Sequence, residues 1–133
     1  MTKNINPVPE GFHTATPYLV VPGVAKLIDF LKQAFDAQEI QRHQRPDGSV
    51  QHAEVRIGDS IIMMGEPLPP QKHMPAMILL YVADVDALYQ RALKAGATSV
   101  RAPADQPYGD RTGGVEDASG NQWWVAARLT KPD

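Results

Sequence analysis

The spacing of apolar residues in the first half of the chain predicts one strand, one helix and three further strands. The run from His13 to Val21 is rich in β-branched and aromatic residues, which is typical of a strand. Pro17 within this strand favours an edge position, because proline has no N–H for a sheet. Apolar residues at helical spacing predict a helix over 24–35. Turn residues then separate predicted strands at 39–45, 50–57 and 60–64.

The second half repeats this order after a proline-rich connector at 67–75. Asp84 is a good N-cap for a helix that ends at Ala95-Gly96. The segment 103–109 is predicted to be a loop. The predicted strands lie at 77–82, 98–101, 112–116 and 122–127.

Residue matches between the halves support an internal repeat. Three residues recur 61 positions later, and Gly58 recurs 62 positions later as Gly120. The three pairs are Val21 and Val82, Val24 and Val85, and Leu27 and Leu88. We therefore predict an α+β domain at 11–133 made of two β-α-β-β-β modules, about 11–66 and about 76–129, after an N-terminal arm at 1–10.

Composition and charge exclude several kinds of protein. The 133 residues are 43% hydrophobic and 21% charged, with a formal net charge of −2 and no run of either sign. A nucleic-acid surface needs clustered basic residues, so we expect no nucleic-acid partner. The chain has no cysteine, and its start has no apolar stretch. We expect no disulfide, no thiolate metal site and no membrane segment, and we predict a cytoplasmic protein.

Several short motifs resemble the glyoxalase/bleomycin-resistance/dioxygenase (vicinal oxygen chelate) superfamily, and most closely its PhnB-like branch. These motifs occur in order from about Gly11 to Leu129. They are Thr16-Pro-Tyr-Leu-Val-Val21, His52-Ala-Glu-Val-Arg-Ile-Gly-Asp-Ser60, Tyr81-Val-Ala-Asp-Val-Asp86, Ala95-Gly-Ala97, Tyr108-Gly-Asp-Arg111 and Glu116-Asp-Ala-Ser-Gly-Asn121. The resemblance implies open, curled sheets around a ligand cavity and a homodimer whose cavities are built from both chains.

The metal ligands that the resemblance implies are missing from this sequence. The resemblance implies His on the first strand, His or Glu at the matching point of the second module, and Glu at the end of each module's last strand. The matching positions here are Thr16, Met77 and Trp124, with Ile62 or a neighbour as the fourth. These side chains do not suit a hard-metal site. We therefore expect no cofactor, with a divalent metal at a displaced site using His13, His52 and Glu54 as the alternative.

Strand alternation places His52 and Glu54 on the same face, because Ala53, Val55 and Ile57 should face the helix. The pair could act as a general base or as two metal ligands, and the alternative is a surface ion pair. Trp123 and Trp124 should point to opposite faces, with Trp123 in the core and Trp124 either in the core or as a stacking wall for a planar ligand.

Further candidates for the cavity side follow from alternation and from the resemblance. Arg111 and Tyr108 lie in a loop that the resemblance places beside the cavity, where they could contact a ligand. The alternative is that Asp110 and Arg111 pair with each other to fix the loop. We expect His13 and His73 to be solvent-exposed. The remaining cavity candidates are Thr16, Tyr18, Met64, Met77 and Tyr81.

Three functions are compatible with the sequence. The first is a metal-free, dimeric protein that binds a small, partly aromatic organic molecule, and it needs only a pocket with aromatic walls. The second is a metal-dependent enzyme of glyoxalase or dioxygenase type with a displaced site. The third is a dimeric structural or regulatory module. The missing ligands favour a binding protein over an enzyme, although the fold itself hosts many functions.

Overall fold

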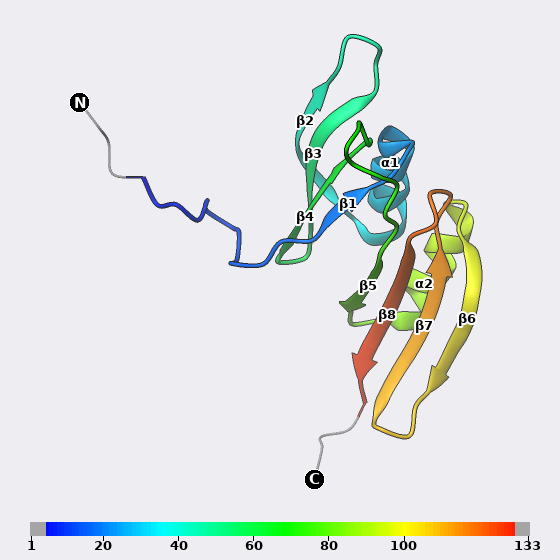
Figure 1. The fold of residues 1–133 in the computed structure, drawn as a ribbon. Helices are drawn as coiled ribbons and strands as arrows, with labels where there is room; N and C mark the ends of the chain where they lie inside the picture. The colour runs from blue at the N-terminus through cyan, green and yellow to red at the C-terminus, as the bar shows by residue number, and fades with distance from the viewer. Residues whose placement is uncertain (1–4, 130–133) are drawn as a thin grey trace.

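The computed structural model describes residues 5–129, so part of the predicted arm, 1–4, and the last four residues lie outside the described part of the chain. Two four-stranded sheets, each with one helix, lie next to each other (Figure 1). The first module contains β1 (Tyr18–Val20), α1 (Val24–Phe35), β2 (Gln38–Gln44), β3 (Val50–Ile57) and β4 (Ser60–Gly65). The second contains β5 (Met77–Tyr81), α2 (Val85–Lys94), β6 (Thr98–Asp105), β7 (Asp110–Glu116) and β8 (Gln122–Arg128).

The strand order confirms the predicted repeat. The sheets are ordered β1-β4-β3-β2 and β5-β8-β7-β6, which is the same arrangement in both modules. In each, the first strand runs parallel to the last and lies at an edge. Pro17 directly precedes β1, and its carbonyl accepts a hydrogen bond from the Met63 amide at 3.0 Å. The missing N–H of Pro17 is therefore not needed at this edge.

Both helices begin and end for identifiable reasons. The carboxylate of Asp84 accepts a hydrogen bond from the Ala87 amide at 3.0 Å, which confirms the predicted N-cap of α2. α1 ends at Asp36, a non-glycine residue in the left-handed region with φ 57°. Aspartate tolerates this conformation better than most residues. The predicted bounds of α1 and β3 agree with the structure, and those of β2, β4, β5 and β8 differ by one residue at one or both ends.

The predicted loop at 103–109 is wrong in its first half, because β6 continues to Asp105. β6 is an edge strand, and its pairing with β7 is irregular between Arg101 and Ala104. Pro103 falls in this irregular segment. A proline is tolerated at an edge or a bulge because a ladder hydrogen bond is not required there.

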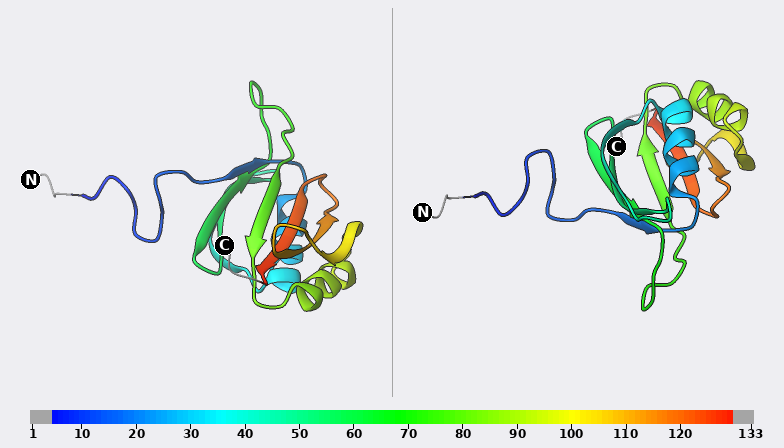
Figure 2. Two further views of the ribbon diagram at one scale, coloured as in Figure 1. Left: turned by 90° about the horizontal axis from the view of Figure 1, so that it is seen from below. Right: turned by 90° about the horizontal axis from the view of Figure 1, so that it is seen from above.

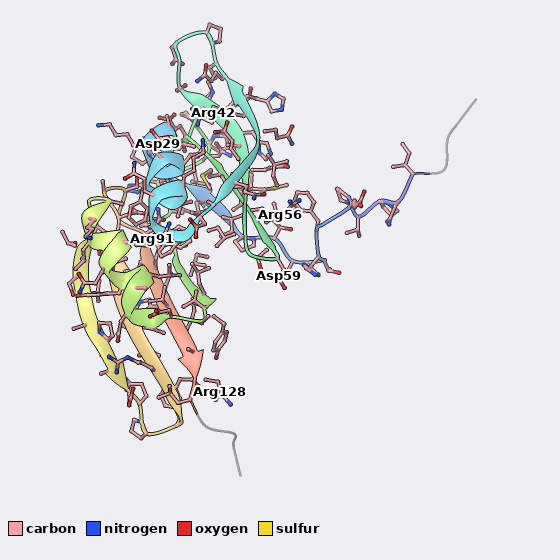
Figure 3. All side chains as sticks on the ribbon, turned by 180° about the vertical axis from the view of Figure 1, so that it is seen from behind. Asp29, Arg42, Arg56, Asp59, Arg91 and Arg128 are labelled. Atoms are coloured by element: carbon pink, nitrogen blue, oxygen red, sulfur yellow. The ribbon has the colours of Figure 1, made fainter. Side chains whose placement is uncertain are left out.

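The two modules are joined through their helices and through one aromatic contact. The ring of Phe35 at the end of α1 lies 5.8 Å from the buried Trp123 ring on β8. The guanidinium of Arg91 on α2 donates to the carbonyl of Gln33 at 2.8 Å and to the Asp36 carboxylate at 2.7 Å. Figure 3 shows Arg91 between the two helices, where α1 ends. One side chain therefore caps α1 and holds the second module to it.

The first described residues lead away from both modules (Figure 2). Ile5 is 81% exposed, which agrees with the predicted arm for this part of the segment. The connector between the modules forms a single isolated bridge, Val20 with Met74. Within residues 5–129, neither helix is long and apolar enough to cross a membrane.

Candidate functional site

Each sheet has one face covered by its helix and one face turned away from it, which we call the inner face. In β3, the side chains of Ala53 and Val55 are buried in the core with α1. His52 and Glu54 alternate with them and therefore lie on the inner face. This is the placement that the sequence predicts for the pair.

Three side chains on the inner face of the first sheet form a continuous hydrogen-bonded chain, which we call the relay. The Tyr18 hydroxyl lies 3.0 Å from Nδ1 of His52. Nε2 of His52 lies 3.0 Å from Oε2 of Glu54. Glu54 is buried, His52 is half-buried and Tyr18 is 40% exposed. The relay thus runs from an accessible phenol to a buried carboxylate.

The surroundings of Tyr18 favour its protonated form, which can donate to His52. Burial raises the pKa of the Tyr18 phenol above its usual value, the positive charge of Arg45 lowers it, and the negative charge of Glu54 raises it further. In the tautomer of His52 that carries its proton on Nε2, the Tyr18 hydroxyl donates to Nδ1 and Nε2 donates to Glu54.

Gly65 on β4 provides the space in which Tyr18 reaches His52. A Cβ atom on Gly65 would fall 3.0 Å from the Tyr18 hydroxyl oxygen and 2.4 Å from the backbone oxygen of Gln51. Any side chain there would collide with the β3 backbone. Glycine is therefore required by both the sheet and the relay.

The inner face of the second sheet carries a flat aromatic surface, which we call the Trp124 platform. Trp124 and its strand partner Gly114 are adjacent on β8 and β7. A Cβ atom on Gly114 would fall 2.7 Å from two indole carbons, so the ring rests on the glycine backbone. The Arg101 guanidinium carbon lies 5.4 Å from the ring centre, within cation–π range. The indole N–H donates to Gln122 at 3.0 Å.

Beside the platform, β5 exposes a line of apolar side chains, the β5 strip, made of Met77, Leu79 and Tyr81. Their exposed fractions are 61%, 45% and 65%. Leu79 is the strand partner of Trp124. Thr16 and Leu79 both line a hollow of about 180 Å³ between the segment 12–17, β4 and β5. The predicted inner-face placement of Met77, Tyr81 and Trp124 is confirmed, and their binding role stays a prediction.

The fourth position, predicted at Ile62 or a neighbour, falls on the neighbour Met63. Ile62 and Met64 are buried in the core on the helix side of β4, and Met63 between them lies on the inner face. Tyr18 pairs with Met63 in the first sheet, and Leu79 pairs with Trp124 in the second. Leu79 follows Tyr18 by 61 residues, and Trp124 follows Met63 by the same number. Gly58 and Gly120 are 62 residues apart, one more than this offset, because the turn between β7 and β8 is longer than the turn between β3 and β4. A one-residue shift moves a strand side chain to the other face.

Met64, predicted to face the cavity, is therefore a core residue. Met63 is the inner-face residue that sequence reasoning missed. The offset of 61 shared by the three earlier matches contained the signal that would have found it.

Arg111 lies on the helix side of β7 and not beside the inner face. Its guanidinium binds the Asp86 carboxylate on α2 at 3.0 Å and Asp105 at 2.9 Å. The expected pair between Asp110 and Arg111 is absent from the ion pairs of residues 5–129. Arg111 faces α2 because it alternates with Asp110 along β7. These carboxylates hold the pKa of the Arg111 guanidinium above its usual value.

Asp110 takes part in a second polar group on the inner face. It is buried, it pairs with Arg128 of β8, and it accepts a hydrogen bond from the Tyr81 hydroxyl at 3.3 Å. Figure 3 labels Arg128 near the end of β8. Tyr108 is exposed at the turn between β6 and β7, where no described contact tests a ligand role.

The displaced metal site of His13, His52 and Glu54 is not assembled in a single chain. His13 lines the same hollow as Thr16, between the segment 12–17, β4 and β5. In the part of the chain that the structure describes, no three His, Asp or Glu side chains lie close enough to hold a metal ion. The positions where relatives carry ligands hold Thr16, Met63, Met77 and Trp124, whose chemistry does not fit a hard divalent ion.

The motif from Glu116 to Asn121 is structural. The buried carboxylate of Asp117 accepts hydrogen bonds from the Trp123 indole at 2.8 Å and from the Asn121 side chain at 3.0 Å. The side-chain oxygen of Asn121 in turn accepts from the Ala76 amide at 3.0 Å. This network ties the β7–β8 turn to the start of β5.

His73 is exposed, as predicted, and one ring nitrogen lies 2.9 Å from the Ser119 carbonyl. His13 is exposed as well.

Comparisons with known proteins agree with this architecture. The model of the glyoxalase/bleomycin resistance protein/dioxygenase superfamily matches residues 12–125. An uncharacterised protein of Mycobacterium bovis is 44% identical over 119 residues, which cover 81% of this chain and 78% of that protein. An uncharacterised protein of Mycobacterium tuberculosis is also 44% identical over 119 residues, which cover 81% of this chain and 70% of that protein.

Solved structures with low sequence identity share the fold. TioX from Micromonospora sp. ML1 has a TM-score of 0.70 and 23% identity, covering 91% of this chain and 100% of TioX. The fosfomycin resistance protein FosX from Mesorhizobium loti has a TM-score of 0.63 and 18% identity, covering 86% and 91%. At this identity the likeness concerns the fold alone, and it confirms the predicted paired modules.

Proposed function

Because this chain belongs to the glyoxalase/bleomycin resistance protein/dioxygenase superfamily, we propose that it is a metal-free protein that binds a small, partly aromatic organic molecule in a cavity between two copies. The observation that carries this proposal is the Trp124 platform. The indole ring rests on Gly114, is half-buried on the inner face and has the Arg101 guanidinium over it. Aromatic walls with a few polar groups are typical of small-molecule sites.

The proposed dimer follows from what a single chain leaves uncovered. The β5 strip exposes three large apolar side chains in line with the platform. β1 and β5 are both sheet edges within the described residues. Exposed apolar side chains beside an open edge favour association with another chain. A second copy that covered the strip would close the inner face into a cavity.

The chemistry of the two inner faces differs, and this sets the kind of ligand. The second sheet offers aromatic and thioether groups from Trp124, Tyr81 and Met77, which suit a planar apolar body. The first sheet offers the relay, whose hydroxyl, imidazole and carboxylate suit a polar group. We place an aromatic ligand against the platform. Membership of the PhnB-like branch and a cytoplasmic location stay predictions.

Titration of tryptophan fluorescence tests the proposal. Trp123 is fully buried in the core, whereas Trp124 lies on the inner face, so a bound planar ligand should quench only Trp124. Wild type and Trp124→Phe are titrated with a panel of planar aromatic molecules, and quenching is expected in wild type alone. Light scattering gives the mass, and metal analysis of protein purified without chelator gives the metal content. A monomer, stoichiometric metal, or an unresponsive Trp124 across the panel would contradict the proposal.

A further inference from the structure

The relay is more than a surface ion pair, because it links an accessible hydroxyl to a buried charge through one imidazole. Each of its two hydrogen bonds measures 3.0 Å. Glu54 is 6% exposed, so its carboxylate is largely shielded from solvent. A hydroxyl, an imidazole and a carboxylate in this order form the arrangement by which proteins activate a weak acid.

We propose that Tyr18, His52 and Glu54 form a proton relay that ionises an acidic hydroxyl group of a bound aromatic ligand, such as a phenol or an enol. This inference rests on the proposed function, since it names the polar group that the ligand carries. It adds a proton-transfer role that binding alone does not require.

The proton transfer balances without any further reactant. When His52 carries its proton on Nε2, the Tyr18 proton is directed at Nδ1 and the ligand hydroxyl donates to the Tyr18 oxygen. The ligand proton moves to the Tyr18 oxygen as the Tyr18 proton moves to Nδ1. The ligand becomes an anion that accepts a hydrogen bond from Tyr18. His52 becomes an imidazolium that donates to Tyr18 and to Glu54.

The groups that surround the His52 ring differ in charge. The Glu54 carboxylate faces Nε2 and compensates the new positive charge. The His43 ring on β2 stacks near the His52 ring, with centroids 6.4 Å apart, and its Nε2 lies 3.0 Å from the side-chain oxygen of Gln41. Arg45 lies on the same hairpin, where its guanidinium donates to Ser49 and to the Glu66 carbonyl.

The position of the Tyr18 hydroxyl in the relay depends on Gly65, a residue of the sheet itself. A Cβ atom on Gly65 would crowd the Tyr18 hydroxyl at 3.0 Å and collide with the Gln51 backbone oxygen at 2.4 Å. Tyr18 also keeps an exposed side, so its oxygen can be approached from the inner face. A ligand seated against the inner face can therefore contact the phenol without displacing His52.

The test uses 4-nitrophenol, whose ionised form absorbs visible light, and 4-nitroanisole, which has the same shape but no hydroxyl proton. Both are titrated into wild-type protein at a pH where free 4-nitrophenol is mostly neutral. We expect the ratio of ionised to neutral probe to rise roughly tenfold on binding, the size expected for charge-assisted hydrogen bonds. Binding of 4-nitroanisole is followed by equilibrium dialysis.

The variants separate proton transfer from binding. His52→Gln can still accept from Tyr18 but cannot take up a proton, and Tyr18→Phe removes the oxygen that contacts the ligand. Both should lose the increase in ionised probe while 4-nitroanisole binding is kept. Tyr89→Phe is the matched control, because it removes a phenol that binds Ser99 on the helix side. It should behave as wild type. If His52→Gln no longer binds 4-nitroanisole, Glu54→Gln replaces it, with the same expected loss of ionisation.

Each result has a distinct meaning. If both probes bind but the bound 4-nitrophenol is ionised no more than the free probe, the relay is wrong and the proposed binding function stands. The same holds if ionisation persists in His52→Gln or Glu54→Gln. If neither probe binds wild-type protein, the proposed binding of aromatic molecules is itself contradicted.

Discussion

The indole ring of Trp124 rests on Gly114, with ring carbons 2.7 Å from the place where a Cβ atom would stand. A single methyl group at this position therefore cannot coexist with the present ring orientation. The pair places one aromatic surface on the inner face of the second sheet. Its position depends on the absence of a side chain on the neighbouring strand.

We expect Gly114→Ala to displace the Trp124 ring and to lower the free energy of unfolding by roughly 1–3 kcal/mol, the usual cost of overpacking. The displacement should change the fluorescence of Trp124 and weaken quenching by planar aromatic ligands. Gly113→Ala is a suitable control, because its methyl would meet Pro103, 3.1 Å away, and not Trp124. Unchanged ligand quenching in Gly114→Ala would show that the platform does not take part in binding.

The phenol of Tyr18 should ionise at a higher pH than an ordinary tyrosine. Burial is the main cause of its raised pKa, and the negative charge of Glu54 adds to it. The folded state therefore holds the Tyr18 proton more tightly than the unfolded chain. This contributes stability below the usual tyrosine pKa of 10.0, and the contribution is lost as the pH rises through the higher folded value.

Nuclear magnetic resonance titration of the Tyr18 ring carbon next to the hydroxyl measures this pKa directly. In Glu54→Gln the value should fall toward the ordinary one, because the neighbouring negative charge is gone. A Tyr18 pKa at or below 10 in wild type would contradict the described environment.

The ion pair between Asp36 and Arg91 should stabilise the contact between α1 and α2, which is the joint of the two modules, in a pH-dependent way. The hydrogen bond from Arg91 lowers the pKa of the Asp36 carboxyl. The contribution is therefore present above the usual carboxyl pKa of 3.8 and is lost as the pH falls through the lower folded value. Asp36→Asn should unfold at lower urea than wild type at pH 7, with the difference shrinking in strong acid.

The Asp36 carboxylate is largely exposed and Arg91 is half-buried, so the effect should also shrink at high salt. Asp47→Asn is a control, because the Asp47 pKa is lowered by hydrogen bonds to Ser49 within one turn, away from the joint. If Asp36→Asn and Asp47→Asn respond alike to pH and salt, the joint has no special part in the effect.

Removal of the buried Asp117 carboxylate should be strongly destabilising. Asp117→Ala leaves the Trp123 indole and the Asn121 amide without their acceptor inside the protein. Unsatisfied buried donors cost about 1–3 kcal/mol each, so for these two donors we expect a loss of roughly 2–6 kcal/mol in the free energy of unfolding. Chemical denaturation measures it. Asp117→Asn, which keeps an oxygen for the indole, should lose less, and equal losses in both variants would point to charge as the dominant factor.

The fold could be predicted almost completely from sequence patterns, because its elements follow local rules. The periodicity around Leu27 and Leu88, the N-cap at Asp84 and the alternation in β3 each correspond to a feature of the structure. The offset of 61 residues describes the same strand pairing in both modules. The end of β6 was mispredicted because Pro103 normally marks a loop, whereas an edge strand with irregular pairing tolerates it.

The candidate site could be predicted only in part, because partners from different strands are not visible in a sequence. Alternation placed His52 and Glu54 together, but Tyr18 joins them through parallel pairing of β1 with β4 and through the space left by Gly65. Arg111 was misplaced because alternation was not applied to the segment taken as a loop. Arg101 was missed, since its role depends on the neighbouring ring of Trp124.

The contacts of Arg91 have a consequence for how the molecule opens. Helix ends ordinarily fray by themselves, and exchange of their amide hydrogens with solvent needs only local opening. Here the Gln33 carbonyl in the last turn of α1 is held by two N–H groups of Arg91 from α2. Unravelling of this helix end therefore requires the two modules to move apart. The rate of amide hydrogen exchange at the end of α1 should therefore report how often the two modules separate.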